Sequence, residues 1–246
     1  MNKIIEEIVS KGTTLTSDGV SVKATSTISK VQGEYIYDLI KNNNDIIKTL
    51  EIGCANGLSS LYICEALKDR DCSEHYIIDP YQSKDWKNRG ITALKRAGLY
   101  KTVNLIEKES EFILPELLEK KGEYFDLIFI DGWHSFDHVM LDIFYSLRLL
   151  KLEGFLILDD CSISSVEKAV QCIDNYCFIN KIQSVFVYPD RFLPRIICHI
   201  GKFIPLSVNI RYRLPKLIKN IIRRPRMIIY QKIASDDRKW NWFAPF

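Results

Sequence analysis

The sequence lacks a long hydrophobic run. Nowhere do about 18 uncharged apolar residues follow one another, so no transmembrane helix is expected. Residues 1–7 are too few and too acidic for a signal peptide. The seven cysteines include no Cys-x-x-Cys pair, which argues against a disulfide framework or a zinc site. These absences predict a cytoplasmic protein with free thiols, and 246 residues suffice for one α/β domain.

Acidic residues are missing between Asp190 and Asp236, where eleven Lys and Arg residues occur. The net charge of the chain is +3, so the remainder carries −8. Within residues 190–225, prolines at positions 194, 205, 215 and 225 exclude a long helix. Three interpretations of this basic insertion stay open: a solvated elaboration, recognition of an anionic acceptor, or peripheral contact with the anionic inner face of a membrane. Nucleic acid is not an expected partner, because few aromatic side chains in the segment could stack on bases.

A strand, a tight turn and a helix are predicted over residues 46–67, and the rest of the chain is organised around them. Gly53 and Gly57 allow the sharp turn because neither carries a Cβ atom. The spacing is acid-x-Gly-x-x-x-Gly, with Glu51 at the strand end, rather than the Gly-x-Gly-x-x-Gly of dinucleotide sites. An acid there repels a pyrophosphate and favours a cationic ligand, which disfavours a nicotinamide dehydrogenase.

Buried strands alternate with helices along the chain, which predicts an α/β, doubly wound, mostly parallel sheet. The helices are expected over residues 1–12, 29–42, 58–67, 85–98 and 136–150, and residues 13–28 are expected to form a loop or flap. Ligands bind beyond the carboxyl ends of the strands in such sheets. Five acids lie at these ends: Glu51, Asp79, Asp131, Asp159 and Asp160.

The last three of these acids are expected to converge at two neighbouring strands. Carboxylates brought together raise one another's pKa unless a cation neutralises them. Hard oxygen ligands without thiolates indicate Mg²⁺ or a similar divalent cation. The sequence therefore predicts a metal site formed by Asp131, Asp159 and Asp160.

The motif around Glu51 resembles motif I of the class I S-adenosylmethionine (SAM)-dependent methyltransferases. The Asp131, Asp159 and Asp160 set is similar to the metal triad of their cation-dependent O-methyltransferase branch, which includes catechol, caffeoyl-CoA and macrolide-sugar enzymes. The resemblance covers roughly residues 25–175 and returns at the last strand and aromatic tail. It implies a Rossmann-like, seven-stranded sheet with helices on both faces. It also implies a single domain with four parts: N-terminal helices and flap (1–45), core (46–185), basic insertion (190–225), and last strand and tail (226–246).

The same resemblance implies roles for individual residues. Glu51 would hold the amino group of SAM, Gly53 and Gly57 would line the cofactor, and Asp79 would bind the ribose. Ser110, within a Ser-x-x-Ile-Leu-Pro run, and Trp133 would contact the adenine. Local alternatives stay open: Asp79 as a turn cap, Ser110 as a helix cap, and Trp133 as a core residue.

His134 follows Asp131 in the run Asp-Gly-Trp-His and stands where the catechol branch has its catalytic lysine. An unperturbed histidine has a pKa of about 6.5, so His134 could act as the general base. Orienting the acceptor, binding the metal or capping a helix are the alternatives. His138, at the i+4 position, is expected to face solvent, and the alternative is that it lines the same face as His134.

These patterns predict a SAM-dependent and Mg²⁺-dependent O-methyltransferase that acts on a hydroxyl group of a small molecule or sugar. Two alternatives are a metal-dependent hydroxylase-like enzyme of the same fold and a membrane-associated, non-catalytic binding protein that uses residues 190–225. The sequence leaves open whether the protein forms a homo-oligomer.

Overall fold

The protein is described here as a computed structural model, in which residues 1–187 and 224–244 are placed. The expected basic insertion therefore lies outside the described residues, except for its last two positions. The division of the chain into four parts stays a prediction for that reason.

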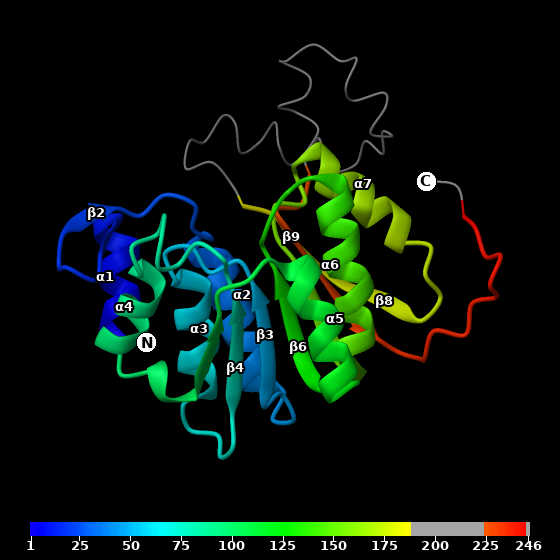
Figure 1. The fold of residues 1–246 in the computed structure, drawn as a ribbon, viewed down its shortest axis with the longest axis horizontal. Helices are drawn as coiled ribbons and strands as arrows, with labels where there is room; N and C mark the ends of the chain where they lie inside the picture. Colours follow the sequence, from blue (N-terminus) through cyan, green and yellow to red (C-terminus); the bar gives the residue numbers. More distant parts are fainter. Residues whose placement is uncertain (188–223, 245–246) are drawn as a thin grey trace, which may run out of the picture.

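The helices and strands follow one another along the chain in alternation (Figure 1). The helices are α1 (Lys3–Lys11), α2 (Lys30–Asn42), α3 (Leu58–Leu67), α4 (Arg89–Arg96), the 3-10 turn η1 (Tyr100–Thr102), α5 (Ser110–Lys121), α6 (Phe136–Leu149) and α7 (Ser164–Ile173). The strands are β1 (Thr13–Leu15), β2 (Ser21–Lys23), β3 (Lys48–Ile52), β4 (Glu74–Ile78), β5 (Val103–Ile106), β6 (Phe125–Ile130), β7 (Leu150–Leu158), β8 (Ile179–Val185) and β9 (Met227–Lys232).

Seven strands form the central sheet in the order β5-β4-β3-β6-β7-β9-β8. The pairs from β5 to β7 are parallel, whereas β9 runs antiparallel to both of its neighbours. The order reverses between β3 and β6, which is the switch point where ligands bind in open α/β sheets. The antiparallel direction of β9 also brings its first residues to the edge where β6 and β7 end.

Helices cover both faces of this sheet, as Figure 1 shows with α1 to α4 on one side and α5 to α7 on the other. Each face has its own buried cluster. One contains Ile36 and Leu61 from α2 and α3, and the other contains Leu114 and Ile143 from α5 and α6. The fold is thus the Rossmann-like, doubly wound α/β arrangement that the sequence predicts.

Some elements differ from the expectation. Residues 13–28 contain the short antiparallel hairpin of β1 and β2 rather than a plain loop. The helix expected from residue 85 begins only at Arg89, because Lys87 and Asn88 have φ angles of +47° and +54° and cannot join a right-handed helix. The helix α7 and the strand β8 have no counterpart among the predicted elements.

A capping box begins α2: the Ser29 side chain accepts from the Gln32 backbone while the Gln32 side chain accepts from the Ser29 backbone. Among the described residues, no helix is long and apolar enough to cross a membrane.

Candidate functional site

A cavity of about 820 Å³ opens at the carboxyl ends of the central strands. Its walls come from the flap and from the loops that follow β3, β4, β5, β6 and β7, together with the residue before β9. Its lining includes Ser26, Thr27, Gly53, Ala55, Asp79, Tyr81, Trp86, Ser110, Glu111, Asp131, Trp133, His134, His138, Asp159, Asp160 and Arg226. Most of the predicted site residues therefore line one cavity.

The two glycines of the motif are required by close packing. Gly53 has a φ of +89°, and a Cβ atom there would overlap the backbone of Asp131 in the neighbouring loop. Gly57 has a φ of +78°, and its Cβ would lie 2.6 Å from the Cα of Gly90. Gly53 lines the cavity, whereas Gly57 is not among the lining residues and packs against α4. The cofactor contact expected of Gly57 stays a prediction.

Asp79 lies at the end of β4 and ties the motif turn to the next loop. Its carboxylate accepts hydrogen bonds from the backbone of Cys54 and Ala55 at 3.1 and 2.9 Å, and from that of Tyr81 at 2.9 Å. The Gln82 amide adds a fourth bond at 2.8 Å. Asp79 therefore holds the turn, as its alternative role requires, and it also lines the cavity where a ribose is expected.

Glu51 is fully buried in a polar network behind the cavity wall. One carboxylate oxygen accepts from the Ser60 hydroxyl and lies 3.1 Å from His75 Nε2, and His75 Nδ1 lies 2.9 Å from the Thr49 hydroxyl. The other oxygen, Oε1, has no hydrogen-bond partner among the described residues. A buried carboxylate oxygen without a partner is costly, and an ammonium group would satisfy it. Glu51 is not itself a lining residue, so its contact with the cofactor stays a prediction.

Ser110 and Trp133 both line the cavity. Glu109 is the N-cap of α5 and Ser110 its first helical residue, so the helix-cap alternative for Ser110 is wrong. Trp133 is 64% exposed, which excludes the alternative of a core tryptophan. His138 also lines the cavity and lies 2.8 Å from the Ser135 hydroxyl through Nδ1. The expectation that His138 faces solvent is therefore wrong, because α6 turns this side chain toward the Trp133 loop.

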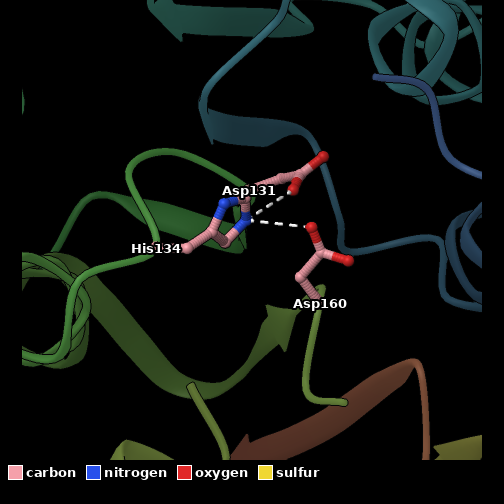
Figure 2. A group of neighbouring side chains, drawn as sticks. All are labelled: Asp131, His134 and Asp160. Carbon is pink, nitrogen blue, oxygen red and sulfur yellow. Dashed lines mark ion pairs between the residues drawn. The ribbon is translucent and has the colours of Figure 1, made fainter. Parts of the chain in front are cut away.

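Asp131, His134 and Asp160 form a compact group beyond the ends of β6 and β7 (Figure 2). His134 Nε2 lies 3.4 Å from Asp131 Oδ1 and 3.1 Å from Asp160 Oδ2. One ligand atom from each residue lies within 4.8 Å of the other two. The two carboxylates suit a hard divalent cation such as Mg²⁺ or Mn²⁺, whereas an imidazole is a more typical ligand of transition metals.

The third predicted ligand, Asp159, is not in this group. Its side chain is almost completely buried and accepts a hydrogen bond from the Gln32 amide of α2. Burial, followed by the charge of Asp131, raises the pKa of Asp159 to about 8. The structure therefore combines two of the three predicted carboxylates with His134, and a metal role for Asp159 stays a prediction.

The electrostatics of this group change the expectation for His134. The carboxylates of Asp131 and Asp160 raise the pKa of His134 to about 10, so the imidazole is protonated at neutral pH in this arrangement. Burial raises the pKa of Asp131 to about 6. Burial acts in the same direction on Asp160, but His134 and Arg226 outweigh it and lower its pKa. The unperturbed pKa expected for His134 from the sequence is therefore wrong, because it takes no account of the carboxylates that the fold places beside the ring.

Three residues beside the site carry no local signal in the sequence. Arg226 lies directly after the basic insertion and contacts Asp160. Gln32 completes the capping box of α2 and also reaches Asp159. Asp142 occupies the apolar face of α6 and is 1% exposed, and neither of its carboxylate oxygens has a hydrogen-bond partner among the described residues. Only the folded chain brings them to the cavity or beneath it.

The comparisons with known proteins agree with this geometry. A family model described as "Methyltransferase domain" matches residues 50–161, from the motif strand to the residue after Asp160. Residues 50–161 of this chain thus match a methyltransferase domain. The resemblance to methyltransferases that the sequence predicts is thereby confirmed. No curated protein matches the chain.

Solved structures of other proteins share the fold of this chain at low sequence identity. An O-methyltransferase from Bacillus cereus in complex with SAH is 13% identical, with a TM-score of 0.65 and coverage of 95% of this chain and 92% of the other. The O-methyltransferase TomG from Streptomyces achromogenes, in complex with SAM, is 15% identical, with a TM-score of 0.60 and coverage of 85% and 82%. The SAH-bound methyltransferase PaMTH1 of Podospora anserina is 20% identical, with a TM-score of 0.56 and coverage of 73% and 80%.

Proposed function

We propose that this protein is a SAM-dependent O-methyltransferase that uses a divalent cation, Mg²⁺ or a similar ion, to act on a hydroxyl group of a small molecule or sugar. One observation carries the proposal. A single cavity joins Asp79, Ser110 and Trp133, the expected nucleoside contacts, to the group of Asp131, His134 and Asp160. A methyl donor and an acceptor held by a metal ion would thus bind in the same cavity. The neighbours named above, which bind SAM or SAH, support the choice of cofactor.

The proposed cofactor contacts follow from the donor and acceptor groups on the cavity wall and, for Glu51, directly behind it. SAM, when bound, supplies the electrophilic methyl group of its sulfonium. Glu51 would accept hydrogen bonds from its ammonium through the unpartnered Oε1, and Asp79 from its ribose hydroxyls. Ser110 and the exposed ring of Trp133 would hold the adenine. These contacts fix the donor, so that methyl transfer needs little further loss of freedom.

The acceptor is proposed to bind at the group formed by Asp131, His134 and Asp160. A divalent cation, when bound, supplies positive charge that lowers the pKa of the acceptor hydroxyl. Asp131 and Asp160 are the carboxylates proposed to hold it, with Asp159 beside them as the third predicted one. With these two carboxylates engaged by a cation, His134 would lose the acceptors that keep its pKa near 10. As a neutral imidazole it would take the hydroxyl proton through Nε2.

Calorimetric titration with S-adenosylhomocysteine tests the cofactor assignment, in Mg²⁺ and in EDTA, with NAD as the control ligand. We expect one-to-one, micromolar binding in both buffers and none of NAD. Glu51→Gln should weaken binding by about tenfold or more, because a charged acceptor of the ammonium is lost. Absence of S-adenosylhomocysteine binding in both buffers would overturn the proposal.

A second titration tests the metal assignment, with Mn²⁺ observed by electron paramagnetic resonance. Asp160→Asn should lose Mn²⁺ binding and methyl transfer while keeping its affinity for S-adenosylhomocysteine. Asp137→Asn is the matched control, since Asp137 lies nearby on α6 with its side chain 81% exposed. Equal Mn²⁺ affinity in both variants would contradict a metal role for Asp160.

A further inference from the structure

Arg226 occupies a fixed position at the acceptor end of the cavity. The antiparallel β9 begins at the edge where β7 ends, and Arg226 directly precedes it. Its backbone N–H donates to the Val185 carbonyl at 2.8 Å, and its carbonyl accepts from the Cys161 N–H at 3.0 Å. The side chain is therefore presented from a rigid backbone rather than from a free loop end.

The residues that the structure describes engage the guanidinium of Arg226 only in part. Its Nη2 lies 2.5 Å from Asp160 Oδ1, whereas its Nε lies 3.8 Å from Asp159, beyond hydrogen-bond distance. A guanidinium has five N–H donors, and this side chain is 40% exposed. Among the described residues that line the cavity, Arg226 is the only lysine or arginine.

A second arginine, Arg224, lies two residues before Arg226 and has a structural role. Arg224 Nη1 lies 3.0 Å from Glu167 and 2.9 Å from the Ser162 carbonyl, and its side chain is only 17% exposed. Arg224 fastens the chain to the start of α7 and does not line the cavity. It offers a matched control for Arg226, with the same side chain and nearly the same place in the sequence.

Asp160 connects Arg226 to the centre where the acceptor hydroxyl is proposed to bind. Its Oδ1 faces Arg226 and its Oδ2 faces His134. The guanidinium and the imidazole are therefore separated by one carboxylate. A small molecule whose hydroxyl lies at His134 would place its next polar group within reach of Arg226.

We propose that Arg226 binds an anionic group of the acceptor, a carboxylate or a phosphate, so that the substrates of this enzyme are acidic small molecules or acidic sugars. The inference rests on the proposed function, because it takes the hydroxyl to bind at Asp131, His134 and Asp160. A planar guanidinium with free donors is suited to carboxylate and phosphate oxygens, which it can bind in pairs. The competing explanation is that Arg226 only neutralises the charge of Asp160. That explanation predicts no preference for anionic ligands over neutral ones.

The test uses the full-length protein saturated with S-adenosylhomocysteine and Mg²⁺. Calorimetry compares glucuronate and glucose 6-phosphate, one for each kind of anion, with neutral glucose. An added charge-assisted hydrogen bond predicts that at least one acidic sugar binds about tenfold to a hundredfold tighter than glucose. Which acid binds identifies the carboxylate or the phosphate as the recognised group.

Three variants assign the preference to the side chain. Arg226→Gln should abolish it, Arg226→Lys should keep part of it, and Arg224→Gln should keep all of it. Binding of S-adenosylhomocysteine to each variant shows that the fold and the proposed cofactor site are intact. The inference is overturned if neither acidic sugar binds tighter than glucose, or if the preference survives in Arg226→Gln. It is also overturned if that variant changes only Mn²⁺ affinity. A wild-type protein that fails to bind S-adenosylhomocysteine would instead reject the proposed function.

Discussion

Asp142 offers a quantitative test of the electrostatics beneath the site. Its carboxyl group is 1% exposed on α6, and a Cβ atom on Gly132 would lie 3.6 Å from its Oδ2, so it lies under the loop that carries Trp133. Burial raises its pKa from 3.8 to about 6, although Ser110 and His138 act in the opposite direction. At about 1.4 kcal/mol for each pH unit, this difference amounts to about 3 kcal/mol.

The sign follows from the direction of the pKa difference. Because the folded pKa is above the unfolded one, the protonated carboxyl favours the folded state at low pH. That contribution is lost as the pH rises from about 4 to about 6, and the charged carboxylate then costs the folded protein about 3 kcal/mol. Asp142→Asn has nearly the same shape and cannot ionise. Its stability relative to the wild type should therefore rise with pH, by about 2 kcal/mol between about pH 4.5 and about pH 8.

Urea unfolding followed by circular dichroism at several pH values measures this difference. Subtracting the wild-type curve from that of the variant cancels the other titrating groups. Asp137→Asn serves as the control, because this acid on the same helix is exposed and its pKa is lowered by Ser135. Parallel pH curves for the wild type and Asp142→Asn would refute the reasoning, since they would mean that the carboxyl group is hydrogen-bonded or solvated.

Three further predictions concern packing and titration at the site. Gly33→Ala would place a methyl group on the Tyr62 ring, so the free energy of unfolding in urea should fall by about 1–3 kcal/mol, whereas an unchanged value would show that the α2–α3 contact is loose. Gln32→Leu removes the side-chain half of the capping box and the donor to Asp159, and should lower the thermal midpoint in calorimetry by an amount equivalent to about 1–2 kcal/mol. In EDTA, the NMR resonances of the His134 ring should titrate near pH 10. The ion pairs of His134 therefore stabilise the fold fully below about pH 6.5, and this stabilisation is lost as the pH rises through about 10. Asp160→Asn should lower that midpoint, and a value near 6.5 in the wild type would show that the pairs do not form in solution.

Local pattern was sufficient for most of the fold. Apolar runs that end in an acid predicted β3, β4, β6 and β7, because a strand buried on both faces must be continuously apolar. The motif glycines marked the turn, since only a residue without a Cβ fits where Gly53 meets the Asp131 backbone. The short edge elements were missed. The strand β8 is largely exposed and lacks a clear alternation, and β1 and β2 are only three residues long.

The sequence by itself determined which chemistry the chain could carry: an acid at each strand end, glycines at the motif turn, and a histidine three residues after Asp131. The tertiary structure alone decided which of these groups meet. Gln32, which lies 127 residues away in the sequence, donates to Asp159, and Asp159 lies outside the group of Asp131, His134 and Asp160. The antiparallel β9 places Arg226 beside Asp160. The physical reason is that periodicity reports only on a residue's own helix or strand. The pKa of His134 and the surroundings of Asp142 depend on charges and burial that other elements supply.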